Sequence, residues 1–126
     1  MRRIKEFGHS LRHAIRGLVY VLKYEKNFQN EVAFSLLVVV AMVYFHVTRA
    51  EMIVLFLVIM LVLIMELLNT IMERIVDILK PRVHPYAKLI KDLMAGTVLL
   101  SSILAVIIGL IIFIPYLAPK IQALMR

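Results

Sequence analysis

The chain has 126 residues, of which 63% are hydrophobic, and its formal net charge is +7. An apolar share this far above the roughly 45–50% of soluble proteins excludes an ordinary soluble domain and indicates a membrane protein. In so apolar a chain we interpret the basic charge as a topology signal and an attraction to anionic lipid headgroups, and we expect no nucleic-acid partner.

The N-terminal segment, residues 1–24, has the pattern of an amphipathic helix. Its apolar residues recur at helical spacing from Ile4 to Leu22, and arginine and lysine residues supply the opposite face. A basic amphipathic helix of this kind usually lies in the plane of the membrane interface. We therefore predict an interfacial helix rather than a membrane-spanning one.

Three apolar runs follow, and each is expected to cross the membrane as a helix. Their approximate ranges are 30–47, 52–74 and 93–114. Pro81 and Pro85 lie in the polar loop after the second run, and Pro115 is expected to end the third helix. The predicted fold is an all-α membrane protein, with residues 1–126 forming a single integral membrane domain.

Lysine and arginine are unevenly distributed over the connecting segments. Seven precede Val32, one lies in the turn at 46–51, five lie in residues 74–91, and two follow Pro115. The positive-inside rule therefore places the N-terminal helix and the loop at 80–91 in the cytoplasm. The predicted topology in the cytoplasmic membrane is N-in and C-out.

Residues 65–77 carry acids from inside an apolar run to its polar end. In a helix with about 100° per residue, Glu66, Asn69, Glu73 and Asp77 fall within about 80° of one another. Glu66 follows fourteen apolar residues, 52–65. A carboxylate there costs about 2.5–3.5 kcal/mol unless it faces protein or water, so an ionisable residue in a span indicates function.

Further charged residues are expected near the same membrane surface, namely Glu25, Glu31, Lys91 and Asp92. Each has a plain alternative, because acids stabilise helix N-termini and lysine marks the cytoplasmic side. Carboxylates and one lysine also suit a magnesium-bound phosphate, since hard cations take oxygen ligands and lysine acts as a point charge on phosphate. No glycine pattern of a soluble nucleotide-binding loop accompanies them. From these residues alone we predict a small acidic site, and no nucleotide is specified.

Small residues repeat every four positions in the third run, at Ser101, Ala105 and Gly109. A stripe of this kind lets membrane helices approach one another closely. Together with short spans that carry acids, it predicts a bundle of more than three helices, most simply a homo-oligomer.

Residues 66–77 resemble the signature of the prokaryotic diacylglycerol kinase family, E-hydrophobic-hydrophobic-N-[ST]-x-[IV]-E-x-x-[VI]-D. The chain departs from the family at Ile71-Met72, where Ala-Ile is usual, and no polar ligand is lost. Residues 91–96 (KDLMAG) are similar to the family's K-D-x-x-[AS]-[AG] run. Weaker similarity at 16–18 and 25–28 extends the resemblance to about residues 10–115.

The resemblance implies an ATP- and magnesium-dependent kinase for a lipid alcohol, built as a homotrimer with sites shared between subunits. Glu66 would be the general base near the lipid hydroxyl, and Asn69 would orient the reacting groups. Glu25 and Glu73 would hold Mg²⁺. The implied nucleotide-binding residues are His13, Glu25, Glu73, Asp77, His84, Lys91 and Asp92. Arg16, together with Glu66, would contact the lipid.

Two lipids and one competing class of protein stay open. Residues 84–88, 95–96 and 113–115 resemble the undecaprenol kinase branch, whereas 28–31 are more similar to the diacylglycerol kinase branch. We favour undecaprenol, with diacylglycerol as the alternative. The competing hypothesis is a non-enzymatic membrane protein, such as a proton or cation conduit through Glu66. A conduit needs polar residues along the whole span, and residues 52–65 have none.

Overall fold

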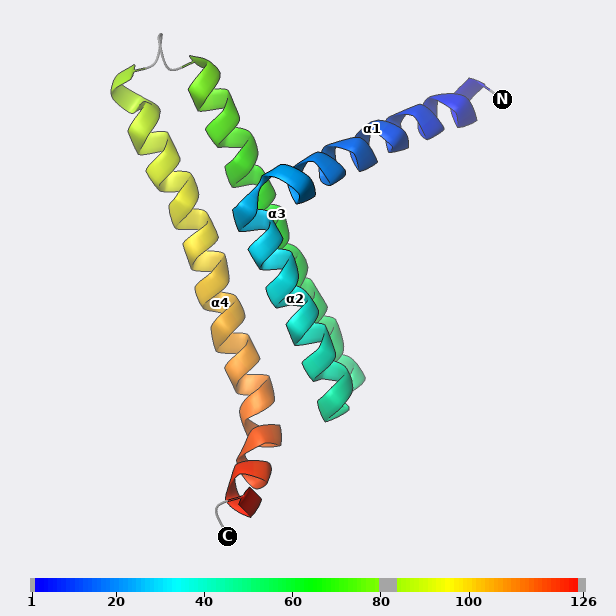
Figure 1. Ribbon diagram of the computed structural model, residues 1–126, viewed down its shortest axis with the longest axis vertical. Coiled ribbons are helices and arrows are strands. Elements are labelled where there is room, and N and C mark those ends of the chain that lie inside the picture. The colour runs from blue at the N-terminus through cyan, green and yellow to red at the C-terminus, as the bar shows by residue number, and fades with distance from the viewer. Residues whose placement is uncertain (1, 80–83, 125–126) are drawn as a thin grey trace.

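The structure is a computed structural model that describes residues 2–79 and 84–124, and these residues form four helices and no strand. The helices are α1 (Arg2–Tyr24), α2 (Lys26–Phe45), α3 (Arg49–Leu79) and α4 (His84–Leu124). Figure 1 shows α3 and α4 running side by side, α2 beside α3, and α1 projecting away from the other three. Because α2, α3 and α4 are each long and apolar enough to cross a membrane, the predicted all-α fold with three spans is confirmed.

The break between α1 and α2 is a single residue, Glu25, whose backbone is extended (φ −103°, ψ 107°). The last carbonyls of a helix lack partners within it. At the end of α1 the Gln29 side chain supplies the missing donor, because its Nε2 donates to the carbonyl oxygens of Leu22 (3.0 Å) and Lys23 (3.1 Å). This cap fixes the direction in which α1 leaves the bundle. The apolar side of α1 stays uncovered, with Phe7 70% exposed, as an interfacial helix requires.

The α3 helix carries the seam on which the bundle packs. Its buried side chains recur every three or four positions along most of its length, the spacing of one helix face. They are Leu55, Val58, Val62, Glu66, Asn69, Thr70 and Val76. The seam is therefore apolar in its first half and polar where Glu66 begins. Most other large apolar side chains on the three long helices are exposed, as expected of helices whose surroundings are lipid.

The turn between α2 and α3 is closed by local hydrogen bonds. His46 adopts a left-handed conformation (φ 51°), and its backbone N–H reaches the carbonyls of Met42 and Val43. Thr48 and Glu51 then form a capping box. Glu51 Oε2 accepts from both the backbone N–H and the hydroxyl of Thr48, each at 2.8 Å. Beside this turn, Met42 and Leu55 belong to a small buried core with Val47 and Ile112.

The expected end of the third span at Pro115 is wrong as a helix end, because α4 continues through Pro115 and Pro119 to Leu124. Contacts on both sides of Pro115 offset the backbone hydrogen bond that proline removes. The Phe113 and Tyr116 rings lie 5.9 and 6.1 Å from the Phe45 ring. Tyr116 also donates a hydrogen bond to Glu51 Oε2 at 2.7 Å.

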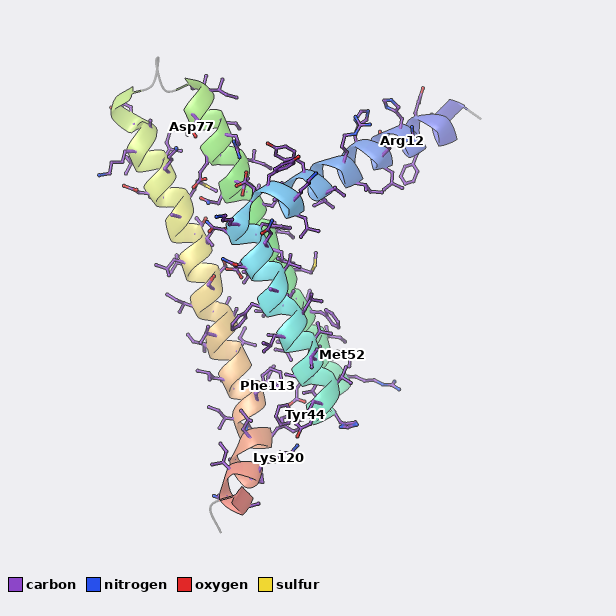
Figure 2. All side chains as sticks on the ribbon, viewed as in Figure 1. Arg12, Tyr44, Met52, Asp77, Phe113 and Lys120 are labelled. Atoms are coloured by element: carbon purple, nitrogen blue, oxygen red, sulfur yellow. The ribbon has the colours of Figure 1, made fainter. Side chains whose placement is uncertain are left out.

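These contacts tie α4 to the α2–α3 turn, and we call the group the latch. Its members are Tyr44, Phe45, Glu51, Phe113, Tyr116 and Lys120. The Lys120 ammonium completes it by lying 4.0 Å from the centre of the Tyr44 ring, a cation–π contact. Figure 2 labels Tyr44, Phe113 and Lys120 near one another at this end of the molecule, with Asp77 at the opposite end.

Helices α3 and α4 also extend beyond the expected spans at their other ends, whereas α2 (Lys26–Phe45) begins before and ends before the expected 30–47. The α3 helix runs over Arg49–Leu79, beyond the expected 52–74, and ends before Pro81, which lies outside the described residues. Pro85 follows His84 in the first turn of α4, well before the expected start at 93. Proline is tolerated in a first turn because the N–H that it lacks would have no helical partner there.

The hydroxyl of Tyr116 should contribute measurably to stability. A hydrogen bond to a charged group is stronger than one between neutral groups, so Tyr116→Phe, which removes the bond to Glu51 Oε2, should lower the unfolding free energy. Denaturation in mixed micelles, followed by circular dichroism, measures the change. Tyr44→Phe is the matched control, because the cation–π contact of Tyr44 uses the ring alone. Equal stability of the two variants would contradict this assignment.

Candidate functional site

Glu66 lies inside the protein rather than against lipid. It is 4% exposed and occupies the α3 seam one turn beyond Val62. The sequence placed Glu66 and Asn69 on one face of a helix, and the structure buries that face. A carboxylate this enclosed keeps its charge only where neighbouring polar groups compensate for lost water. The groups around Glu66 therefore decide what it can do.

Those neighbours come from α2 and from the next turns of α3. The Asn27 side chain lies near enough to Glu66 to stabilise its carboxylate, and the carboxylates of Glu31, Glu73 and Glu25 are close enough to act on it electrostatically. We call the four glutamates the acid cluster. Because like charges repel strongly at short range, such a cluster favours a proton or a cation in its midst. The cluster lies where the apolar half of the bundle ends.

Asn69 sits between Glu66 and Glu73 with unused hydrogen-bonding capacity. Its Nδ2 donates to Glu73 Oε1 at 3.3 Å. Its Oδ1 is the only buried side-chain polar atom without a partner in the described part of the chain. An unsatisfied buried acceptor costs about 1–3 kcal/mol. The site is therefore ready to receive a donor or a cation at that oxygen.

Glu25 immediately precedes α2, but its side chain makes no capping hydrogen bond to the helix. Instead, its Oε1 accepts a hydrogen bond from Arg74 Nη2 on α3, and the two form an ion pair. This contact decides against the plain alternative of an ordinary helix-capping acid. It also joins the α1–α2 junction to α3 next to Glu73. A cation held by Glu25 would share this carboxylate with Arg74.

A second ion pair joins α3 to α4 at the polar end of the bundle. Lys91 Nζ donates to Asp77 Oδ1 at 2.6 Å. Asp92, the next residue on α4, is exposed. Three of the residues expected to bind nucleotide thus lie together at this end. His84 begins α4, but its side chain lies outside what the structure describes.

His13 and Arg16 are both exposed on α1 and are not brought to the acid cluster by this chain. The ring of His13 contacts that of His9, with 4.4 Å between centroids. Among the described residues, neither His13 nor Arg16 makes a hydrogen bond or ion pair to the acid cluster. Nucleotide binding by His13 and lipid contact by Arg16 therefore stay predictions, because no contact within one subunit supports them.

No group of three or more histidine, aspartate or glutamate side chains in the described ranges is arranged to hold a metal by itself. Magnesium in phosphate-transfer sites is usually bound by one or two carboxylates, with phosphate and water completing the shell. Glu73, Glu25 and the unpartnered Asn69 Oδ1 provide donors of that kind. In the type of donor atom, these residues suit a magnesium ion that also binds a phosphate.

Sequence reasoning left two contributors out of the site and left the role of a third open. Asn27 was not considered, and Arg74 was counted only for topology. Glu31 was expected near this surface, either in the acidic site or as a helix-end charge. Their contacts join α2 to α3, so spacing within one segment could not reveal them. The one available signal was the number of acids at the start of the first apolar run, where Glu25 and Glu31 lie six residues apart.

Fold and site together define a helical membrane protein with a buried acidic site where the apolar half of its bundle ends. Comparison with known families identifies the protein more closely. The family described as prokaryotic diacylglycerol kinase matches residues 12–113. The chain belongs to that family, as residues 66–77 predicted.

Two curated relatives extend over most of this chain. The undecaprenol kinase of Bacillus subtilis (strain 168) is 36% identical over 114 residues, which are 90% of this chain and 93% of that protein. The diacylglycerol kinase of Synechocystis sp. (strain ATCC 27184 / PCC 6803 / Kazusa) is 38% identical over 107 residues, 84% of this chain but only 61% of that protein. Both relatives carry the names of lipid kinases.

Proposed function

We propose that this protein transfers the γ-phosphoryl group of ATP to the hydroxyl of a membrane lipid alcohol. The observation that carries the proposal is the burial of Glu66 at the point where the α3 seam changes from apolar to polar. A lipid hydroxyl lies just below the headgroups, and ATP arrives from water. An acid at that boundary is placed to meet both substrates.

In the proposed reaction the lipid oxygen attacks the γ-phosphorus, and the bond between that phosphorus and the β–γ bridging oxygen breaks. ADP leaves, and the hydroxyl proton passes to Glu66, the general base. Asn69 orients the reacting groups through its amide, whose Oδ1 has no other partner within the described residues. Phosphoryl transfer depends chiefly on positioning and charge stabilisation, and this site offers both.

Glu73 and Glu25 would hold Mg²⁺, the proposed cofactor. The bound ion would neutralise phosphate charge during transfer. Lys91 would contact the phosphates once its pairing with Asp77 loosens. Asp92, Asp77 and His84 would bind the remainder of the nucleotide, with Glu25 and Glu73 reaching it through the metal.

We place the site at the cytoplasmic face of the cell membrane, with the chain N-in and C-out as the positive-inside rule predicts. In Figure 1, α3 and α4 extend past the level at which α1 leaves the bundle. With α1 lying in the interface, Asp77 and Lys91 would be in water and Glu66 below the surface. This depth order is the one the reaction needs.

The proposed assembly is a homotrimer with shared sites. Its support is that His13 and Arg16 make no contact with the acid cluster within the described part of one chain. In an oligomer they could reach a neighbour's cluster, where His13 would bind nucleotide and Arg16 the lipid. Mass measurement in detergent by light scattering tests the subunit number.

Undecaprenol is the lipid we favour, and diacylglycerol is the alternative. The support is coverage, since the undecaprenol kinase relative matches over 93% of its length and the diacylglycerol kinase over 61%. The rival hypothesis of a conduit needs a polar path along the bundle. The buried residues of α3 before Glu66 are Leu55, Val58 and Val62, which are all apolar.

One assay tests the proposed function directly. The purified protein in lipid vesicles receives ATP labelled at the γ-phosphate, with undecaprenol and diacylglycerol in parallel reactions. We expect label in the lipid fraction only when Mg²⁺ is present, and faster labelling of undecaprenol. No labelling of either lipid by folded protein would reject the kinase, and faster labelling of diacylglycerol would reject only the favoured substrate.

A further inference from the structure

Arg74 is a basic residue that contacts the acid cluster and has no part in the proposed reaction. Within the described residues, its pair with Glu25 is the one ion pair that a member of the cluster makes. The two partners are 49 positions apart in the sequence. Arg74 also occupies a position that the family signature at residues 66–77 leaves open. Its contact with Glu25 is therefore a feature of this chain that the signature does not require.

The backbone of Glu25 is fixed on both sides. Its N–H donates to the Val21 carbonyl at 2.9 Å, and its carbonyl accepts from the Gln29 N–H at 3.1 Å. The side chain can still rotate, because each of its torsions has several staggered minima. A carboxylate at the end of such a side chain needs a partner if it is to bind a metal in one defined place.

Arg74 supplies that partner at one of the two carboxylate oxygens. Its Nη2 donates to Glu25 Oε1, whereas Glu25 Oε2 makes no hydrogen bond to a described residue. The Arg74 side chain is 60% exposed and that of Glu25 is 21% exposed. The guanidinium therefore holds the carboxylate from its more exposed side and leaves the second oxygen available.

A second acid near Arg74 has a cation of its own. Asp77 lies one turn further along α3, close enough to act on Arg74 electrostatically. Arginine and aspartate at this spacing on a helix often interact. Asp77 accepts a hydrogen bond from Lys91 at 2.6 Å, however, and the guanidinium of Arg74 donates to Glu25. The two cations at this end of the bundle thus hold two different carboxylates.

We propose that Arg74 is a positioning residue of the metal site, which fixes the Glu25 carboxylate through Oε1 so that Oε2 can bind Mg²⁺. The inference rests on the proposed function, in which Glu25 and Glu73 hold that ion. Carboxylates that bind metals are usually hydrogen-bonded in turn, and loss of such a partner lowers metal affinity by about 10–100-fold.

The positive charge of Arg74 has the opposite effect, because a guanidinium repels a bound cation. Exposure decides between the two effects. Water and salt screen charges on exposed side chains, and the Arg74 side chain is 60% exposed. The hydrogen bond orients the carboxylate whether or not the charge is screened. We therefore expect Arg74 to strengthen metal binding, and the sign of its effect can be measured.

The test measures binding of Mn²⁺ alone, without nucleotide or turnover. Mn²⁺ takes the same oxygen ligands as Mg²⁺, and electron paramagnetic resonance reports its free concentration. The full chain in mixed micelles is titrated as the unaltered protein and as Arg74→Gln, Glu25→Gln and the double variant. Lys26→Gln is the matched control, because it removes the same charge from an exposed residue next to Glu25.

Arg74→Gln should weaken Mn²⁺ binding by about 10–100-fold. It should raise the Mg²⁺ concentration for half-maximal lipid labelling by a similar factor, with near-normal turnover at saturating Mg²⁺. Arg74→Lys keeps a charged donor and should bind Mn²⁺ within about threefold of the unaltered protein. In the Glu25→Gln background, Arg74→Gln should have no further effect, since Arg74 acts through Glu25. Lys26→Gln should change neither measurement.

A second substitution guards against a folding defect. Arg74→Met keeps much of the alkyl stem and also removes the donor, so it should weaken Mn²⁺ binding as Arg74→Gln does. Circular dichroism shows which of the two variants is folded. The alternative role for Arg74 is to hold α1 in place, because Tyr20 of α1 lies near the same guanidinium. In that case Arg74→Gln would act equally with and without the Glu25 carboxylate.

The outcomes separate the role of Arg74 from the kinase itself. Unchanged or tighter Mn²⁺ binding by the folded Arg74 variants would overturn the proposal, and so would an equal loss in the Glu25→Gln background. In either case lipid labelling by the unaltered protein would leave the kinase standing. If Glu25→Gln bound Mn²⁺ normally, Glu25 would lose its place as a metal ligand, and the role of Arg74 would fall with it.

Discussion

Glu66→Gln should lower the rate of phosphoryl transfer by about 10²–10⁴-fold, the usual contribution of a positioned general base. Glutamine keeps the size and hydrogen-bonding capacity of the side chain but cannot take a proton from the lipid hydroxyl. By transition-state arithmetic the expected loss corresponds to about 3–5 kcal/mol. The measurement is the turnover number in vesicles at saturating ATP, Mg²⁺ and lipid.

Binding of ATP should be nearly unchanged in the same variant, because Glu66 acts on the lipid rather than on the nucleotide. Glu51→Gln is the control, since Glu51 belongs to the same helix but lies at the latch end. It should be somewhat less stable and normally active while folded. Near-normal turnover of Glu66→Gln would remove Glu66 from the role of base.

Glu73→Gln should raise the Mg²⁺ concentration needed for half-maximal activity by at least about tenfold. Even groups that only support a metal ligand change affinity by about 10–100-fold when mutated, and Glu73 is proposed as a direct ligand. Its carboxylate accepts from Asn69 Nδ2, and glutamine can keep that contact through its carbonyl oxygen. The substitution therefore removes charge while leaving the local hydrogen bond available.

A magnesium titration at fixed total lipid and excess ATP measures the shift, and turnover at saturating Mg²⁺ should recover in part. Glu51→Gln again provides the control, with an unchanged titration midpoint. If Glu73→Gln lost turnover at every Mg²⁺ concentration with the midpoint unmoved, Glu73 would act on the reaction itself and not through the metal.

Much of the site follows from a single helix and was therefore predictable. Glu66, Asn69 and Glu73 share one face because of helical geometry alone, and the Asn69–Glu73 contact is an i, i+4 pair. Asp77 and Lys91 were both expected at the polar end, and they pair there. Contacts that join more distant segments were not predictable, including the Glu25–Arg74 pair and the approach of Glu31 to Glu66.

The helix ends show the same division. An apolar run indicates where a helix can cross a bilayer, since about 20 residues span the hydrocarbon core and every backbone group must be bonded within it. It does not indicate where the helix stops once it leaves lipid. At Pro115 the local rule favours an end, whereas the contacts of Phe113 and Tyr116 with the α2–α3 turn keep α4 intact.

By itself, then, the amino-acid sequence determined the membrane class, the number of spanning helices, the family and the face that carries Glu66. These depend on composition, periodicity and local spacing, which each segment possesses alone. Only the tertiary structure decided that this face is buried and that Glu25 and Glu31, at the start of the α2 region, lie near it. These features depend on how the helices pack side by side. The spacing of residues within one helix does not determine which residues of another helix lie against it.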